Sequence, residues 1–74
     1  MKICDLTPTE SRLLSLLEQH RGEVLDARFI YEAVWQERFL PASRNTVTVH
    51  ILHLRRKCPA LKLRTVWGRG YTLD

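Results

Sequence analysis

The residues with the clearest chemical potential are cations gathered on one predicted helix, Ser43 to Lys57. Ser43 is suited to cap the first turn, because a serine hydroxyl accepts a hydrogen bond from an unpaired backbone N–H there, and Pro59 ends the helix. One stripe of this helix is apolar and consists of Val47, Ile51, Leu54 and Cys58. The opposite side carries small polar groups, apolar groups and cations, a combination that suits the major groove of DNA.

A basic triplet at the end of a helix has a simpler explanation, since cations there interact favourably with the helix dipole. Two observations favour a binding surface over that explanation for Arg55, Arg56 and Lys57. Val49 and Leu52 lie on the polar side of the helix, where a purely solvated surface would carry polar residues. The rest of the C-terminal half also repeats the positive charge.

Charge is distributed unevenly along the 74 residues, whose formal net charge is +4. Residues 1–37 contain four cations and seven acids, whereas residues 38–73 contain eight cations and no acid. The positive half indicates that a polyanion docks there. The eight cations are Arg38, Arg44, Arg55, Arg56, Lys57, Lys62, Arg64 and Arg69.

The same residues give little support to enzymatic or metal chemistry. No local motif places a nucleophile beside a base, so we expect no enzyme activity and no cofactor. His50 and His53 are spaced as ligands on one helix, but no cysteine or carboxylate stands beside them, so no metal site is predicted.

The cysteines and the hydropathy pattern bear on the cellular compartment. Cys4 and Cys58 are too few for a disulfide framework and are interpreted as reduced thiols that fill the core. No apolar run is long enough to span a membrane, and the first residues lack the apolar region of a secretory signal. We therefore expect a cytoplasmic protein without membrane contact by this segment.

Two further helices are predicted before the basic one. Thr7, Pro8 and Glu10 form a capping-box pattern for a helix over residues 8–20. Asp26 is the N-cap of a helix over residues 27–36. A loop over residues 37–42 follows, and residues 2–6 are a candidate short strand that needs a distant partner.

After Pro59 the apolar period changes from that of a helix to that of a strand. The alternation from Leu61 to Trp67 predicts a strand, a Gly-Arg-Gly turn follows, and residues 71–73 form the return strand. Arg69 stands between two glycines at the tip, where it can enter a minor groove, whose negative potential attracts arginine. Trp35 and Trp67 are interpreted on general burial grounds as core residues rather than DNA contacts.

Three helices followed by a β-hairpin is the element order of a winged helix-turn-helix, an α+β fold. We predict one domain over residues 1–74, with helix 43–57 in the major groove of double-stranded DNA and hairpin 62–73, the wing, at the adjacent minor groove. The alternative is a winged-helix protein-interaction module whose basic face meets an acidic partner.

Four ordered blocks carry a family resemblance from Leu6 to Leu73. They are LTPTE (6–10) with RLL (12–14), EAVW (32–35), NTV (45–47) with VHI (49–51) and LRRK (54–57), and RTVWG (64–68) with GY (70–71). Together they resemble the OmpR/PhoB-type DNA-binding domain of bacterial two-component response regulators. The resemblance implies a transcription regulator that binds operator DNA, often as a tandem dimer on direct repeats, and contacts RNA polymerase through loop 37–42.

The resemblance also implies roles for single residues. The base-contact candidates are Thr46, Thr48, Val49 and His53. The phosphate-contact candidates are Trp35, Arg44, His50, Arg55, Arg56 and Lys57. Arg69 is the wing contact in the minor groove.

Some positions depart from the family pattern. Thr48 replaces a common aspartate, and Leu52 and His53 replace residues that are often polar or basic, so no base preference is transferred. Only residues 2–6 could represent the usual N-terminal sheet, and no receiver domain is present. Two alternatives stay open: a fragment of a response regulator, or a minimal domain of a differently wired regulator such as the membrane-anchored ToxR/CadC-like proteins.

Overall fold

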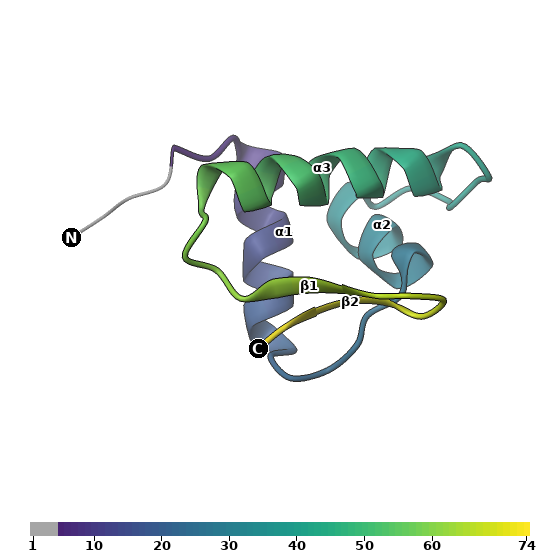
Figure 1. The fold of residues 1–74 in the computed structure, drawn as a ribbon. Coiled ribbons are helices and arrows are strands. Elements are labelled where there is room, and N and C mark those ends of the chain that lie inside the picture. Colours follow the sequence, from purple (N-terminus) through teal and green to yellow (C-terminus); the bar gives the residue numbers. More distant parts are fainter. Residues whose placement is uncertain (1–4) are drawn as a thin grey trace.

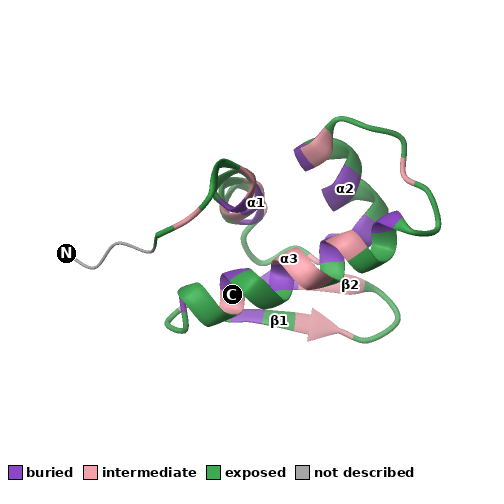
Figure 2. Cartoon of the chain, turned by 90° about the horizontal axis from the view of Figure 1, so that it is seen from above, coloured by how far each residue is buried: buried purple, intermediate pink, exposed green. Residues whose placement is uncertain are grey.

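The computed structural model describes residues 5–74 and contains three helices followed by one antiparallel hairpin. The helices are α1 (Pro8–Gln19), α2 (Ala27–Trp35) and α3 (Ser43–Lys57), and the strands are β1 (Leu63–Val66) and β2 (Gly70–Leu73). The hairpin runs along one side of α3, and α1 and α2 lie on the other side of α3 (Figures 1 and 2). The predicted element order is confirmed.

Local capping explains where α1 and α2 begin. The Thr7 hydroxyl accepts a hydrogen bond from the Glu10 backbone N–H at 3.2 Å, and the Glu10 carboxylate accepts one from the Thr7 N–H at 3.0 Å. This reciprocal pair is a capping box. At α2, Asp26 Oδ1 accepts a hydrogen bond from the Phe29 N–H at 2.8 Å. Both predicted caps are confirmed.

The start of α3 differs from the prediction. Ala42 is the N-cap, and no side chain caps the helix; Ser43 is already the first helical residue. The Ser43 hydroxyl instead accepts a hydrogen bond from the Leu40 N–H at 3.1 Å, and the Ser43 N–H donates to the Leu40 carbonyl at 2.8 Å. The predicted N-cap role of Ser43 is wrong because its hydroxyl closes the preceding loop.

One hydrophobic core joins the helices to the hairpin. The apolar stripe of α3 is confirmed, with Val47, Ile51 and Leu54 each no more than 1% exposed. Buried residues of α3 alternate with exposed ones along its length (Figure 2). The stripe packs against Leu13 and Leu17 of α1, Ile30 and Val34 of α2, and Leu63 and Leu73 of the hairpin. Among residues 5–74, no helix has the length and apolarity needed to cross a membrane.

Cys58 follows α3 and belongs to this core, with 4% of its surface exposed. Its burial is as predicted, but its sulfur is disulfide-bonded, so the predicted reduced thiol is wrong for this residue. The cysteine count excluded a framework of several bridges, not a single bridge. The interpretation of Cys4 falls outside the described residues.

The backbone of the second strand attaches the hairpin to the connection between α1 and α2. On one edge β2 pairs with β1, so that Leu63 lies opposite Leu73 and Val66 opposite Gly70. On its other edge, the Leu25 N–H donates to the Tyr71 carbonyl at 2.8 Å, and the Tyr71 N–H donates to the Leu25 carbonyl at 2.9 Å. The connection between α1 and α2 therefore acts as a short third partner, which the sequence did not predict.

The predicted strand boundaries need two corrections. The alternating segment from Leu61 forms a strand only over residues 63–66, since the turn begins directly afterwards. The predicted strand over residues 2–6 lies mostly outside the described residues, and Asp5 and Leu6 have no regular secondary structure.

Candidate nucleic-acid interface

The surface of α3 divides into an inward stripe, two flanks and an outward row, because successive residues of a helix are about 100° apart. The flank toward the hairpin carries Arg44, Thr48 and Arg55, and the flank toward α1 and α2 carries Thr46, His50 and Lys57. The outward row consists of Asn45, Val49, Leu52 and Arg56, with His53 beside it. This row projects into solvent, and Leu52 is 41% exposed.

Two side chains on the hairpin flank bond to the wing. Arg55 Nε donates to the Leu63 carbonyl at 3.0 Å, and its Nη2 donates to the Thr65 hydroxyl at 2.8 Å. Thr48 Oγ1 donates to the Arg44 carbonyl at 3.1 Å and lies 3.2 Å from the Tyr71 hydroxyl. The structure thus uses the polar groups of Arg55 and Thr48 to hold the wing beside α3.

The opposite flank forms a row of aromatic rings that begins on α2. Trp35 is half-buried, and its ring is stacked on Tyr31 with the centroids 5.0 Å apart. The His50 ring meets Trp35 edge to face at 4.9 Å, and its Nδ1 lies 2.8 Å from the Thr46 carbonyl. The His53 ring follows at 6.0 Å. Trp35, His50 and His53 are therefore brought together. Within residues 5–74, no group of three histidine, cysteine or acidic side chains could hold a metal ion.

Lys57 forms an ion pair with Glu10 at the end of this flank. The two charged groups are 2.7 Å apart, and Glu10 is buried with 3% of its surface exposed. The hydrogen bond from Lys57, followed by the one from the Thr7 backbone, holds the pKa of Glu10 below its ordinary value of 4.5. Lys57, which the sequence analysis assigned to a phosphate contact, therefore joins α3 to α1, and its charge is neutralised by Glu10.

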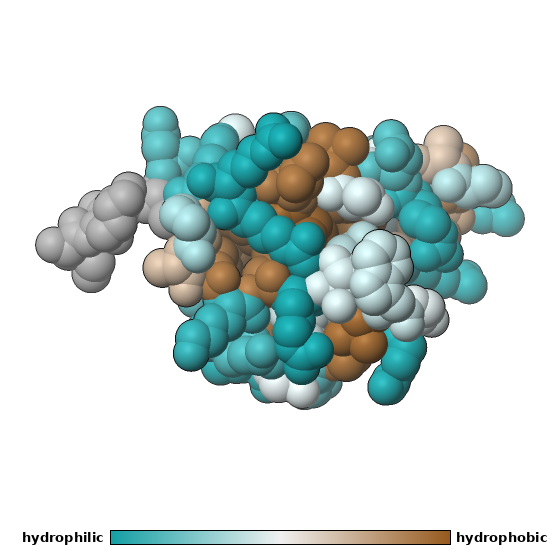
Figure 3. Space-filling view, viewed as in Figure 1, coloured by the Kyte–Doolittle hydropathy of each residue, from teal (hydrophilic) through white to brown (hydrophobic). Residues whose placement is uncertain are grey.

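The positive half of the chain is partly neutralised by acids outside it. Arg64 pairs with Asp74 at 2.9 Å, and Lys57 pairs with Glu10. The remaining six cations have no acidic partner among residues 5–74: Arg38, Arg44, Arg55, Arg56, Lys62 and Arg69. Hydrophilic side chains accordingly dominate the face between α3 and the hairpin, around smaller apolar patches (Figure 3).

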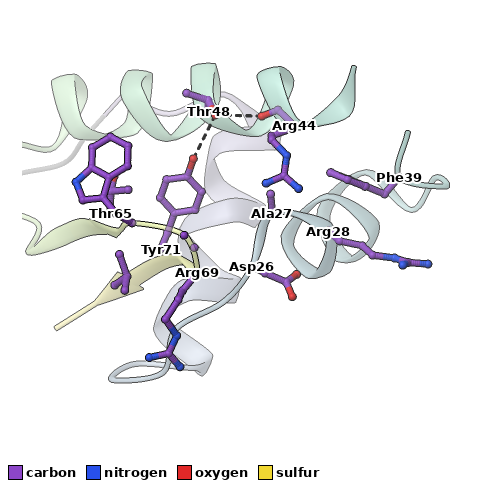
Figure 4. A pocket seen from close by; sticks show the side chains of 13 residues that line it. Asp26, Ala27, Arg28, Phe39, Arg44, Thr48, Thr65, Arg69 and Tyr71 are labelled. Carbon is purple, nitrogen blue, oxygen red and sulfur yellow. Dashed lines mark hydrogen bonds between the residues drawn. The ribbon is translucent and has the colours of Figure 1, made fainter. Parts of the chain in front are cut away.

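An open groove of about 600 Å³ separates α3 from the hairpin and the start of α2. Three arginines line it, together with the hydroxyls of Thr48 and Tyr71. In Figure 4, Arg44 points from α3 toward the start of α2, whereas Arg69 points away from α3. The third arginine is Arg28. The groove therefore places positive charge between the two elements predicted to contact DNA.

Trp67 stands at the tip of the wing with 89% of its surface exposed. The Arg69 N–H donates to the Val66 carbonyl at 2.9 Å, which closes a β-turn over residues 66–69. Gly68 has a φ of 77°, as the third residue of a type II turn requires. Trp67 occupies the second position, at the outer corner, so the predicted core role is wrong because the strand ends one residue before it.

Some residues on the candidate interface were missing from the sequence-based candidates. Asn45 and Leu52 lie on the outward row, and the helical spacing had already placed them on the polar side. Thr65 and Tyr71 face α3 through their hydroxyls. No local signal identifies these two, because their role depends on how the hairpin packs against α3.

Comparison with known proteins identifies bacterial regulators as relatives. The family described as "Transcriptional regulatory protein, C terminal" matches residues 2–73. The chain is 36% identical over 78 residues to the regulatory protein VanR of Enterococcus faecium, an alignment that covers 99% of this chain and 34% of VanR. The chain thus spans about a third of the length of that relative.

Solved structures confirm the winged helix-turn-helix fold. The DNA-binding domain of Bacillus subtilis CssR superposes with a TM-score of 0.88 at 34% identity, over 99% of this chain and 82% of that one. The DNA-binding domain of the response regulator AdeR, solved in complex with an intercistronic region, gives 0.85 at 26% identity, over 99% and 76%. The resemblance carried by the four sequence blocks is confirmed.

Proposed function

Because the chain belongs to the family of transcriptional regulatory protein C-terminal domains, we propose that it is the DNA-binding domain of a bacterial response regulator and binds double-stranded DNA sequence-specifically. The observation that carries this proposal is the position of the uncompensated cations. Arg44, Arg56 and Arg69 lie on α3 and the wing, the two elements that border one groove. A duplex offers regularly spaced phosphates to such a surface.

The outward row of α3 is proposed to enter the major groove. Three flank residues, Thr48, Arg55 and Lys57, are bonded to neighbouring elements, whereas the side chains of the outward row form no hydrogen bond or ion pair within residues 5–74. This row is therefore the part of α3 most open to base edges. Asn45 offers an amide that can read adenine, and Val49 and Leu52 offer apolar contacts of the kind that thymine methyl groups make. Thr46, Thr48, Val49 and His53 stay base-contact proposals, to which Asn45 and Leu52 are added.

Phosphate contacts are proposed to flank this row. Trp35 and His50 lie together on one side, Arg44 lines the groove on the other, and Arg56 projects outward. Phosphate contacts fix the register of a protein on the duplex, and base contacts specify the sequence. Arg55 and Lys57 are already bonded to the wing and to α1, so we assign them chiefly a positioning role.

The loop between α2 and α3 is proposed to contact RNA polymerase. Tyr31 donates its hydroxyl hydrogen to Glu37 at 2.9 Å, and the Phe39 N–H donates to Glu32 at 3.2 Å. These bonds order loop 37–42 while Leu40 stays 52% exposed, as a protein contact would need. Tandem binding on direct repeats, a single domain over residues 1–74, cytoplasmic localisation and the absence of enzyme activity belong to the same proposal.

A salt-dependent titration with duplex DNA tests the function. Six uncompensated cations should give a log–log salt slope of magnitude roughly 4 to 6, since each phosphate neutralised contributes about 0.9. Selection from a library of randomised duplexes should then reveal a preferred sequence. No binding to any duplex at about 50 mM salt would reject the proposal and favour the acidic protein partner as the ligand.

A further inference from the structure

The wing carries an aromatic side chain that the proposed cation contacts do not use. Among residues 5–74, the exposed large hydrophobic side chains are Phe29 at 44%, Leu40 at 52%, Leu52 at 41% and Trp67 at 89%. Trp67 is held outward by the turn itself, because the bond from the Arg69 N–H to the Val66 carbonyl fixes the corner on which it stands. Its exposure is therefore a feature of an ordered turn.

The surroundings of Trp67 indicate what covers it. The indole lines the same groove as Arg28, Arg44 and Arg69, so an uncharged ring is set among cations. A ligand that covers this surface must present negative charge and an apolar face within a few ångströms of each other. A duplex meets both needs, since its phosphates are joined by deoxyribose rings and its minor groove accepts apolar side chains.

We propose that the Trp67 indole is the principal contact of the wing with DNA and lies against the sugar and base edges of the minor groove next to the α3 site. This inference rests on the proposed DNA binding. It adds which side chain of the wing contacts the minor groove. Arg69 points away from α3 (Figure 4), so its guanidinium is assigned to the flanking part of the minor groove, while Trp67 lies next to the α3 site.

The two kinds of contact differ in their response to salt. A cation on a phosphate releases counterions, and its loss lowers the magnitude of the salt slope by about 0.9. An indole on a sugar releases none, so its loss weakens binding by the same factor at every salt concentration. Burial of an aromatic side chain corresponds to roughly ten- to hundredfold in affinity.

The first experiment measures duplex affinity across a salt series for the parent, Trp67→Ala and Trp67→Phe. We expect Trp67→Ala to bind roughly ten- to hundredfold more weakly with an unchanged slope, and Trp67→Phe to keep part of the affinity. Phe29→Leu is the matched control, because it removes an exposed aromatic ring that packs against His20 and does not line the groove, so this variant should bind like the parent. Melting temperatures should agree among all four proteins.

The second experiment follows the indole directly through acrylamide quenching of tryptophan fluorescence. Trp67→Phe leaves only the half-buried Trp35, so the difference between it and the parent reports Trp67. Duplex DNA should shield the parent strongly from the quencher and change the quenching of Trp67→Phe less, because the remaining indole, Trp35, is already half-buried before it meets a phosphate. A parent that binds duplex while its exposed indole stays fully quenchable would overturn the inference.

The outcomes separate this inference from the proposed function. If the parent binds no duplex, the function fails and the inference fails with it. If the parent binds and Trp67→Ala binds equally well, only the inference fails. A weaker Trp67→Ala whose slope also falls by about 0.9 would overturn the direct contact, since the ring would then act by placing a cation.

Discussion

The Arg55 guanidinium donates a hydrogen bond to the Thr65 hydroxyl at 2.8 Å and so joins α3 directly to β1 of the wing. Its Nε holds the Leu63 carbonyl of the same strand at 3.0 Å. Because one side chain spans both bonds, the spacing between the helix proposed for the major groove and the hairpin proposed for the minor groove depends on it. The residue thus couples the two elements proposed to contact DNA.

We expect Arg55→Ala to destabilise the domain by about 1–2 kcal/mol, since two hydrogen bonds of about 1 kcal/mol each are lost. Arg56→Ala is the matched control, because its side chain is exposed and forms no hydrogen bond or ion pair within residues 5–74; its stability should change by less than about 0.5 kcal/mol. Urea unfolding of both variants provides the measurement. Equal stabilities would show that Arg55 does not hold the wing.

We expect different residues on the outward side of α3 to set the affinity for DNA and the preference among sequences. Arg56→Ala should weaken binding to all sequences alike and lower the salt slope by about 0.9, as the loss of one phosphate contact does. His53→Ala and Val49→Ala should instead change the preference among sequences. Selections from a randomised duplex library compare the variants. Unchanged preferences in both His53→Ala and Val49→Ala would move base recognition to another surface.

Local sequence rules predicted those features that depend on neighbours in the chain. The capping box of Thr7 and Glu10 and the apolar stripe of α3 need only a few consecutive residues, and both are confirmed. The helix-then-hairpin order follows from a change of apolar period. Two kinds of feature were missed. The N-cap assigned to Ser43 failed locally, because its hydroxyl accepts a hydrogen bond from the Leu40 N–H instead. The ion pair of Lys57 was missed because nothing near it in the sequence indicates that Glu10 lies against it.

The candidate site was predictable to the same extent. Helical spacing placed the polar and basic side of α3 correctly, but not which of its members are bonded to the wing. Trp67 was assigned to the core because tryptophan is usually buried, whereas a turn that begins at Val66 places it outside. Thr65 and Tyr71 could not be assigned, because their role depends on contacts between α3 and the hairpin.

The lowered pKa of Glu10 predicts that the domain loses stability at acid pH, so that a plot of melting temperature against pH has a falling acid limb. Its pKa is lower in the folded protein than its ordinary value of 4.5, first because of the Lys57 hydrogen bond. Folding therefore favours the carboxylate, so this stabilisation is complete above the unfolded value and is lost as the pH falls through the folded one. Melting temperatures should fall as the pH is lowered below 4.5.

The Glu10→Gln variant should show a flatter acid limb, because glutamine can keep the capping box but carries no titrating charge. Glu18→Gln is the control, since its carboxylate is half exposed in a surface pair and should leave the acid limb like that of the parent. An equally steep limb in Glu10→Gln would assign the acid sensitivity to other carboxylates.

Gly70 predicts a steric requirement at the junction of the wing with the α1–α2 connection. Its φ is 151°, and a Cβ built there would overlap the backbone of Leu25. We expect Gly70→Ala to destabilise the domain by about 2–4 kcal/mol, through strain and loss of the bridge between Leu25 and Tyr71. Gly68→Ala faces open space and should cost only about 1–2 kcal/mol, for its positive φ. Thermal unfolding of both compares them, and equal losses would contradict the close approach.

Removal of Arg69 tests what the positive charge of the wing contributes to DNA binding, separately from Trp67. The residue is exposed on a turn, so Arg69→Ala should change stability by less than about 0.5 kcal/mol. The same change should weaken DNA binding by about 1–2 kcal/mol and lower the salt slope by about 0.9, because one cation is lost. The loss should be larger on duplexes whose flanks are rich in A and T, where a narrow minor groove attracts arginine.

Two duplexes that differ only in the A/T content of their flanks provide the comparison, with Lys62→Ala as a control for the loss of another exposed cation of residues 38–73. Lys62→Ala should show no dependence on the flanks, because Lys62 lies before β1, at the other end of the strand from the turn. Equal affinities of Arg69→Ala and the parent on both duplexes would remove Arg69 from the interface. A loss of the same size on both would place its guanidinium on an outer phosphate, outside the narrow groove.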